Sequence, residues 1–321
     1  MIRFLIRRLI GTAAVLFAVS VLVFLIFFKT PGVDPARQMA GRNPNPETIA
    51  QIRKDFGLDK SLPEQYFTLM NRLVIKRDLI SYSDRGRVLP RVVDAIPVTL
   101  SLVVGAAIIW VVFGIGMGLA AAVSRGTLLD PALMILGMIG ISMPVFWLGN
   151  VVNLVTQERL HVSVFSWLPG LGYTPFSQSP STWFLQLLFP WITLAISYIG
   201  LYGRVLRANL IEVESEDFVR TARAKGLTER RVLIRHSLRT SLISFVSLFG
   251  LDFGALAGGA ALLTEQVFGL PGIGKLTYIS LTRFDLPVVM AIVMYGAFFV
   301  VFANLVVDLV YARLDPRIRP A

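Results

Sequence analysis

The sequence predicts an all-α membrane protein with six transmembrane helices. Its residues are 55% hydrophobic and only 16% charged, whereas a soluble domain carries about a quarter charged residues. The apolar residues occur in continuous runs near the roughly 20 residues that a helix needs to cross hydrocarbon. Continuous runs exclude a transmembrane β-barrel, whose strands alternate. The six predicted spans are residues 9–28, 97–123, 132–154, 186–206, 242–264 and 287–310.

The distribution of Lys and Arg predicts that both chain termini are cytoplasmic. With the N-terminus inside, the inside segments carry sixteen of these residues and the short outside loops carry three. The segment 29–96 carries the other twelve, but segments longer than about 60 residues cross the membrane largely regardless of charge. The net charge of +11 therefore indicates basic cytoplasmic loops rather than nucleic-acid binding.

The residue inventory leaves little for catalysis or metal binding. The chain has no cysteine and only two histidines, His161 and His236, which lie far apart in the sequence. Thiol nucleophiles, zinc–thiolate sites and multi-histidine centres are thereby excluded within one chain. We expect no catalytic residue, no metal ligand and no membrane enzyme.

The segment 30–96 is predicted to be folded and external. Asn45 can cap a helix that begins at Pro46 and ends at Gly57. A second amphipathic helix is predicted over 63–76. Its apolar residues are Tyr66, Phe67, Met70, Leu73 and Val74. The segment is either a small cap on the membrane helices or a docking surface for a partner that delivers substrate.

The segment 203–240 is predicted to form a helix, a glycine break and a second helix. Ser215, Glu216 and Asp217 resemble a helix start, with acidic residues at its positive end. Gly226 interrupts the helical pattern. A basic cytoplasmic loop often binds anionic lipid, but this one mixes nine bases with five acids. The mixture favours a protein-docking element.

Five segments carry a resemblance to a known family, in order and over nearly the whole chain. They are FGLDKSLPEQY (56–66), IPVTLSL (96–102), DFVRTARAKGLTERRVLIRHSLR (217–239), VFGLPGIGKL (267–276) and VDLVYARLDPRIR (307–319). Together they resemble type I ABC importer permeases of the dipeptide/oligopeptide variant. Residues 217–239 are similar to the cytoplasmic EAA loop of that family, although Arg220 and Thr221 stand where Glu and Ala are usual.

The resemblance implies a type I permease fold and a division of labour between subunits. The implied partners are a second homologous permease, two ATPase subunits that bind ATP and Mg²⁺, an extracytoplasmic binding protein and membrane lipid. The chain itself would bind no cofactor and would lie in a bacterial or archaeal inner membrane. Its implied parts are the tail and first helix (1–29), the external segment (30–96), the transmembrane domain (97–312) and a cytoplasmic tail (313–321).

The same resemblance assigns the short helix around 216–226 to a groove of one ATPase. Phe218, Ala222 and Lys225 are predicted to share one helical face, and Phe218 and Leu227 to anchor the contact. Gly226 suits a hinge with positive φ. The predicted coupling residues are Glu216, Asp217, Phe218, Arg220, Ala222, Arg223, Lys225, Gly226 and Leu227.

Three polar residues inside the predicted spans are candidates for the translocation path. Asp252 is the first of them, because a central carboxylate is costly unless it faces a cavity or a partner. An interhelical hydrogen bond to Ser or Asn is the alternative for Asp252. Asn150 and Asn153 are weaker candidates. The small-residue run 254–261 is predicted to let another helix approach closely.

The stretch GLPGIGKLT (269–277) matches the first seven positions of a phosphate-binding loop but has Leu276 where the motif needs Ser or Thr. It follows the fifth span and therefore faces outside. Pro271, Gly272 and Gly274 instead predict a tight re-entrant turn that leads into a short helix. We assign these three residues to an external gate or to the contact with the binding protein.

The predicted function is a permease subunit of an ATP-driven importer for di- or oligopeptides. Nickel complexes and oligosaccharides are alternative substrates within the same family. An ion-coupled carrier is the alternative from another class, but such carriers tend to have several buried ionisable residues and internal repeats. One deep carboxylate and no evident repeat favour the importer subunit.

Overall fold

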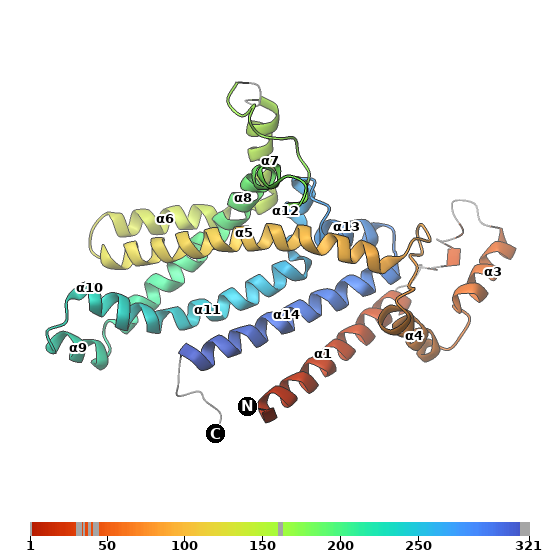
Figure 1. The fold of residues 1–321 in the computed structure, drawn as a ribbon, viewed down its shortest axis with the longest axis horizontal. Coiled ribbons are helices and arrows are strands. Elements are labelled where there is room, and N and C mark those ends of the chain that lie inside the picture. Colours follow the sequence, from red (N-terminus) through yellow and green to blue (C-terminus); the bar gives the residue numbers. More distant parts are fainter. Residues whose placement is uncertain are drawn as a thin grey trace. The chain divides into compact units, whose positions relative to one another are not determined.

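The computed structural model describes residues 2–29, 34, 36–37, 40, 45–159 and 163–314, and its regular elements are helices. An isolated antiparallel bridge joins Ile80 to Arg87. Elements labelled η are wider, π-helical turns. In chain order (Figure 1) the elements are α1 (Ile2–Lys29), α3 (Pro46–Phe56), α4 (Leu62–Met70), η1 (Asn71–Lys76), α5 (Val88–Val123), α6 (Leu129–Ser142), α7 (Val145–Asn153), η2 (Leu154–Arg159), α8 (Pro180–Val213), α9 (Asp217–Ala224), α10 (Glu229–Val232), η3 (Leu233–Ser237), α11 (Leu238–Ala255), η4 (Leu256–Ala260), α12 (Leu262–Val267), α13 (Ile273–Thr282) and α14 (Leu286–Leu314).

The chain divides into two compact units, which are described separately. The first unit comprises residues 1–99, 257–262 and 271–301. The second comprises residues 100–256, 263–270 and 302–321. The end of the predicted cytoplasmic tail, 315–321, and His161 lie outside the described residues.

Among the described residues, four helical stretches are long and apolar enough to cross a membrane. They are Val88–Val123, Pro180–Val213, Glu229–Ala260 and Leu286–Val306. A bent pair of helices, Leu129–Ser142 and Val145–Glu158, makes a fifth crossing if it counts as one span. The first predicted span lies on α1, where the apolar stretch is the shorter Ala13–Ile26. The all-helical membrane fold is confirmed, and six full crossings are not reached in the part of the chain that the structure describes.

The third predicted span, 132–154, is wrong as one straight helix. The axes of its two halves differ by 89°. Met143 between them is extended, with φ −85° and ψ 119°, and Pro144 caps α7. The ring of a proline disfavours the helical conformation in the preceding residue, so the Met143–Pro144 pair explains the break.

The fifth predicted span, 242–264, also differs from the structure. Gly259 has φ 115° and interrupts the helix, and α12 begins after it. Few residues other than glycine adopt such a φ. The small-residue run that was predicted to allow close packing therefore also ends the crossing. The close approach itself is confirmed, because a Cβ atom on Gly258 would lie 3.1 Å from the backbone of Gly296 in α14.

The segment predicted to be external contains the two predicted helices. The Asn45 side chain accepts a hydrogen bond from the Glu47 N–H (3.2 Å), and Gly57 ends α3 with φ 64°. The second helix comprises α4 and η1. Its buried residues are Tyr66, Leu69 and Leu73. The predicted apolar face was partly wrong, because Phe67 and Val74 follow these positions by one residue and point outward; both are more than half exposed.

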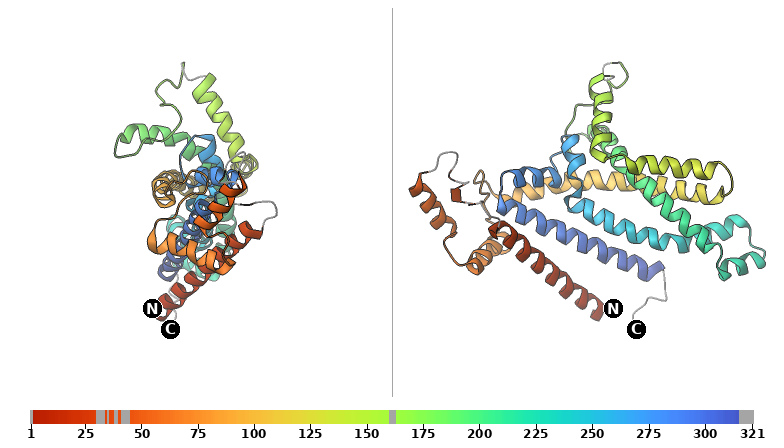
Figure 2. Two further views of the ribbon diagram at one scale, coloured as in Figure 1. Left: turned by 90° about the vertical axis from the view of Figure 1, so that its right-hand side faces the viewer. Right: turned by 180° about the vertical axis from the view of Figure 1, so that it is seen from behind.

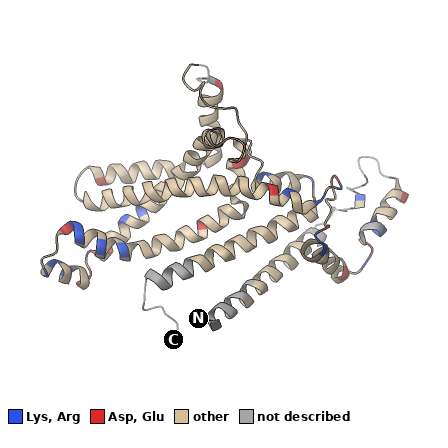
Figure 3. Ribbon diagram, in the orientation of Figure 1, with Lys and Arg blue, Asp and Glu red and all other residues tan. Residues whose placement is uncertain are grey.

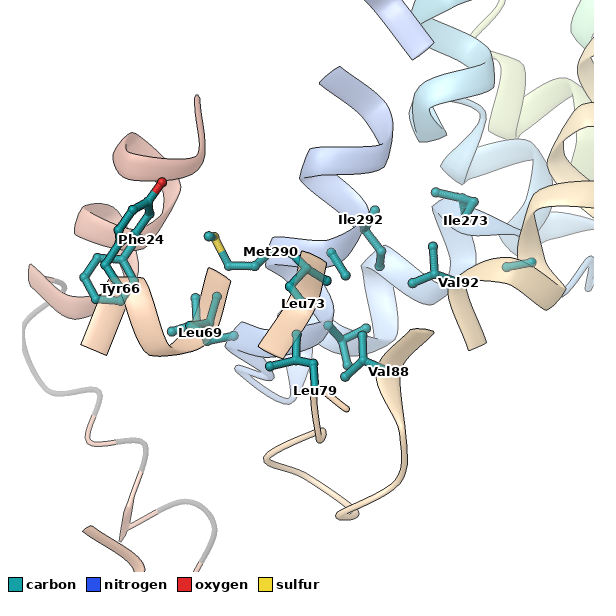
Figure 4. Packing of buried hydrophobic residues seen from close by; sticks show 14 residues of the cluster. Phe24, Tyr66, Leu69, Leu73, Leu79, Val88, Val92, Ile273, Met290 and Ile292 are labelled. Carbon is teal, nitrogen blue, oxygen red and sulfur yellow. The ribbon is translucent and has the colours of Figure 1, made fainter. Parts of the chain in front are cut away.

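The first unit has a core that joins this external segment to the ends of three long helices. Figure 4 shows side chains from α1, α4, η1, α5 and α14 gathered in it. Tyr66 packs edge-on against Phe24, with ring centroids 5.5 Å apart, and its hydroxyl lies 2.6 Å from that of Ser20. The segment 66–88 is therefore packed onto helices of its own unit.

A buried carboxylate adds a polar connection to this core. Asp285, which precedes α14, is 2% exposed. It accepts hydrogen bonds from the Ser81 hydroxyl, the Ser83 hydroxyl (2.8 Å) and the Tyr82 N–H (3.0 Å). These donors neutralise the cost of burying the carboxylate and tie the turn before α5 to the start of α14.

The second unit is packed through glycine contacts between helices. Helix α6 lies against α8, as Figures 1 and 2 show from two sides. A Cβ atom on Gly200 of α8 would lie 2.2 Å from the carbonyl oxygen of Gly137 of α6. A Cβ atom on Gly118 of α5 would lie 2.7 Å from the carbonyl oxygen of Gly203. Small residues let backbones approach closely in lipid, where the hydrophobic effect does not drive helices together.

The Gly200→Ala variant tests these contacts. The added methyl group has no space beside Gly137, and overpacking of this kind costs about 1–3 kcal/mol. We expect a lower Tm in detergent for Gly200→Ala, measured by thermal unfolding. Gly116→Ala on α5 is the matched control, since a Cβ atom there meets nothing within 4 Å. An equal Tm for the two variants would contradict the packing argument.

Candidate functional site

The segment 203–240 forms a small helical projection in the second unit. It runs from the end of α8 through α9, α10 and η3 into α11. Lys and Arg are concentrated along it in Figure 3. The N-cap of α9 is Glu216, with an extended backbone (φ −72°, ψ 147°), and Asp217 lies in the first turn. The predicted helix start is thereby located one residue after Ser215.

The projection has an apolar core of its own. Val219, Ala222 and Val232 are buried, and the partly buried Val213 and Leu227 pack against them. Val219 and Ala222 are three residues apart on α9, so they lie on one face. Because α9 packs on α10 through this core, the two short helices form one compact body rather than two separate arms.

Phe218 and Ala222 are four residues apart on α9 and are therefore neighbours, as predicted, but they differ in exposure. Ala222 faces the core of the projection, whereas Phe218 is 42% exposed. Leu227 also packs inward and is not an outward anchor. The sequence reasoning missed Val219, which the pair Val219–Ala222 at helical spacing could have indicated. Phe218 is left as the large apolar side chain that α9 presents outward.

Gly226 has the predicted positive φ, 78°. Its N–H donates to the Arg223 carbonyl oxygen (2.9 Å), and the Leu227 N–H donates to that of Ala222 (3.4 Å). A Cβ atom on Gly226 would meet nothing within 4 Å. The position therefore needs glycine for its backbone conformation and not for space.

Two exposed ion pairs lie on the surface of the projection. Arg223 Nε lies 3.0 Å from Glu229 of α10, and Arg220 lies 3.6 Å from Asp217 within α9. Exposed pairs of this kind contribute little to stability. Lys225 is exposed, so the charged groups of the predicted coupling set remain accessible to a partner.

Asp252 lies in α11 and is hydrogen-bonded across helices. The Tyr202 hydroxyl of α8 donates to its carboxylate over 2.8 Å. Sequence reasoning considered Ser or Asn as such a donor and missed Tyr202. A carboxylate at the bilayer centre costs about 2.5–3.5 kcal/mol on insertion scales, and one neutral donor offsets part of that cost.

The other two pathway candidates are hydrogen-bonded to backbone. The Asn150 side chain donates to the Phe146 carbonyl oxygen of its own helix (2.9 Å). The Asn153 side chain donates to the Val267 carbonyl oxygen (2.9 Å) and so joins α7 to the end of α12. The second contact holds the bent half of the third span in place.

An ion pair that the sequence reasoning missed joins α6 to α8. Arg207 contacts both carboxylate oxygens of Asp130, at 2.5 and 2.6 Å. Both residues lie just outside the predicted spans, so nothing in the sequence pattern brought them together. A planar guanidinium matches a carboxylate in this bidentate geometry.

The external stretch forms the predicted turn and short helix. Gly272 precedes α13 with an extended backbone. The Ile273 N–H donates to the Thr99 hydroxyl (2.8 Å), and a Cβ atom on Gly274 would lie 2.4 Å from the backbone of Leu262. Pro271 and Gly272 line a cavity of about 310 Å³. Its other lining residues are Arg91, Asp94, Ala95, Lys275, Leu276 and Ile279.

Two ionisable groups in the turn before α5 are held in fixed protonation states at neutral pH. Arg91 lies 2.7 Å from Asp84. Its hydrogen bond lowers the pKa of Asp84 to about 2, so the pair is ionised at neutral pH. Burial, together with the nearby Asp285 charge, raises the pKa of Tyr82 to about 12 and keeps that hydroxyl protonated.

Comparison with known proteins identifies the family. Residues 114–320 match the model of the binding-protein-dependent transport system inner membrane component, and residues 1–103 match the N-terminal model of such membrane components. The chain belongs to this family of ABC importer permeases.

Individual relatives agree over the full length. A Brucella abortus protein named as a peptide transport system permease is 35% identical over 98% of each chain. The glutathione transport system permease protein GsiC of Escherichia coli K12 is 36% identical over 99% of each chain. A solved structure of the MetNI methionine ABC transporter shares the fold, with TM-score 0.54 and 17% identity over 71% of this chain and 97% of that one.

The core of the projection is tested by two neighbouring substitutions. Val219→Asp places a charge in an apolar core, which is strongly unfavourable, whereas Phe218→Asp changes an exposed position. We expect trypsin to cleave the 203–240 segment of the purified Val219→Asp protein at least about tenfold faster than wild type, and Phe218→Asp at about the wild-type rate. Equal cleavage of both variants would show that Val219 does not hold the projection together.

Proposed function

We propose that this chain is the permease subunit of an ATP-driven importer of di- or oligopeptides. It forms half of the translocation pathway and is itself not catalytic. An extracytoplasmic binding protein delivers the peptide, and two ATPase subunits bind and hydrolyse ATP with Mg²⁺. A second, homologous permease supplies the other half of the pathway.

The observation that carries the substrate class is the end-to-end similarity to permeases named for peptides and for glutathione, itself a short peptide. This similarity covers 98% and 99% of the chain. The alignments include both the predicted external segment and the membrane helices. The similarity therefore does not depend on one shared motif.

The projection supports the proposed coupling. Its own core makes α9 and α10 a compact body, which transmits a push better than a loose loop. Phe218 is an apolar group that it offers to a groove, and Arg220 and Lys225 are charged groups exposed on the same projection. Closure of the ATPases would move this body and with it α8 and α11, which continue directly from it.

The proposal also assigns sides of the membrane. The projection and both termini face the cytoplasm, because sixteen Lys and Arg lie on that side and three lie in the short outside loops. The turn with Pro271, Gly272 and Gly274 then faces outside and acts as the external gate or as the contact with the binding protein. Asp252 is the proposed pathway residue; the backbone contacts of Asn150 and Asn153 favour structural roles for them.

Uptake by the reconstituted transporter tests the proposal. We expect the purified permease to bring down ATPase subunits, and proteoliposomes with the complete complex to import tri-alanine only with ATP and binding protein. Uptake by the permease alone, driven by an ion gradient, would instead establish a carrier.

Two substitutions of Gly226 test the hinge in the coupling body. Valine is strained at positive φ, by about 1–2 kcal/mol, whereas asparagine visits this region readily. We expect Gly226→Val to raise the number of ATP molecules hydrolysed per peptide imported several-fold, with Gly226→Asn near wild type. The two rates are measured in the same proteoliposomes, and wild-type coupling in Gly226→Val would rule out the hinge role.

A further inference from the structure

Asp252 is held by a hydrogen bond whose donor carries no charge. The donor is the neutral hydroxyl of Tyr202, at 2.8 Å. Among the described residues, the ion pairs join other acids to Arg and do not include Asp252. The Asp252 side chain is only partly buried, so a positively charged group can reach it.

The carboxylate is held in one orientation. Tyr202 is fully buried. Its ring packs edge-on against Phe245 with centroids 4.7 Å apart, and its Cβ would be 3.1 Å from a Cβ atom placed on Gly114. A ring confined in this way directs its hydroxyl, and that hydroxyl positions the carboxylate before any ligand arrives.

Aromatic rings from three helices, α5, α8 and α11, cluster around Tyr202, the residue that donates to Asp252. Trp110 stacks on Tyr198, with centroids 4.7 Å apart, and approaches Phe249 at 5.8 Å. Phe249 stacks on Phe253 at 5.5 Å. On α11, Phe249 lies three residues before Asp252 and four before Phe253, so it is a helical neighbour of both. Tyr198, Phe249 and Phe253 are partly exposed, so their rings are open to a ligand.

A fixed carboxylate beside aromatic faces is the chemistry that recognises a small organic cation. The carboxylate supplies the charge and hydrogen-bond acceptors, and the ring faces attract the cation through their quadrupoles. A low-dielectric surrounding strengthens both interactions. An anionic group obtains neither of them, and a neutral donor obtains a hydrogen bond without the attraction between opposite charges.

We propose that Asp252, positioned by Tyr202 and flanked by Tyr198 and Phe249, transiently binds the α-ammonium group of the peptide during translocation. This inference rests on the proposed function. It assigns to the permease a selectivity for a free peptide N-terminus. A Lys side chain of the peptide is a second source of the same cation, and the test separates the two sources.

The test compares three probes in proteoliposomes that contain the complete transporter. The probes are tri-alanine, N-acetyl-tri-alanine and N-acetyl-Ala-Lys-Ala, each supplied on saturating binding protein whose loading is measured separately. We expect Asp252→Asn to lower the initial rate for tri-alanine at least about tenfold and that for N-acetyl-tri-alanine less than twofold. Asp252→Glu should restore part of the rate for tri-alanine.

Each outcome has a defined meaning. If Asp252→Asn lowers the initial rate for tri-alanine alone, the site binds the α-ammonium group. If it lowers the rate for N-acetyl-Ala-Lys-Ala equally, the site binds cations in general, and its specificity for the N-terminus is overturned. Equal loss for all three probes overturns the cation site and leaves Asp252 with a structural role or a pairing with the second permease. If wild type imports none of the probes in the presence of ATP, the peptide importer itself is wrong, and the cation site is rejected with it.

Discussion

Close backbone contact between helices is the constraint on which the rest of this structure depends. In lipid the hydrophobic effect does not press apolar helices together, so packing and hydrogen bonds must do so. Gly137 and Gly200 bring α6 and α8 together in the second unit, and Gly258 and Gly296 bring η4 and α14 together in the first. These contacts set the separation at which side chains on adjacent helices can meet.

The polar groups in the helices depend on that separation. Asp130 reaches Arg207 because α6 and α8 are close, and Asp252 reaches Tyr202 because α11 packs on α8. In the first unit Asp285 is satisfied by the turn at 81–83. Each of these three carboxylates therefore has a donor on another segment. Asp130 and Asp285 are buried, whereas Asp252 is partly exposed and its donor is neutral.

The projection formed by residues 203–240 is stabilised in a different way from the membrane helices. Its segment is polar enough to sit in water, and a few apolar residues suffice to close it on itself. Val219 and Ala222 face inward, so the outward side of α9 includes Phe218 and charged side chains. A body with an internal core and an exposed aromatic group is suited to fit a partner without rearranging.

The sequence by itself determined the helical membrane class, the capped helix after Asn45, the left-handed conformation at Gly226 and the family. These follow from local signals: hydropathy, caps and motifs act over a few residues. Only the tertiary structure decided that 132–154 bends by 89°, that Ala222 and Leu227 face inward, and that Tyr202 and Arg207 are the partners of Asp252 and Asp130. The bend, the side-chain orientations and the polar partners depend on which helices pack together and on how each is rotated about its axis. That packing is set by contacts between residues far apart in the chain.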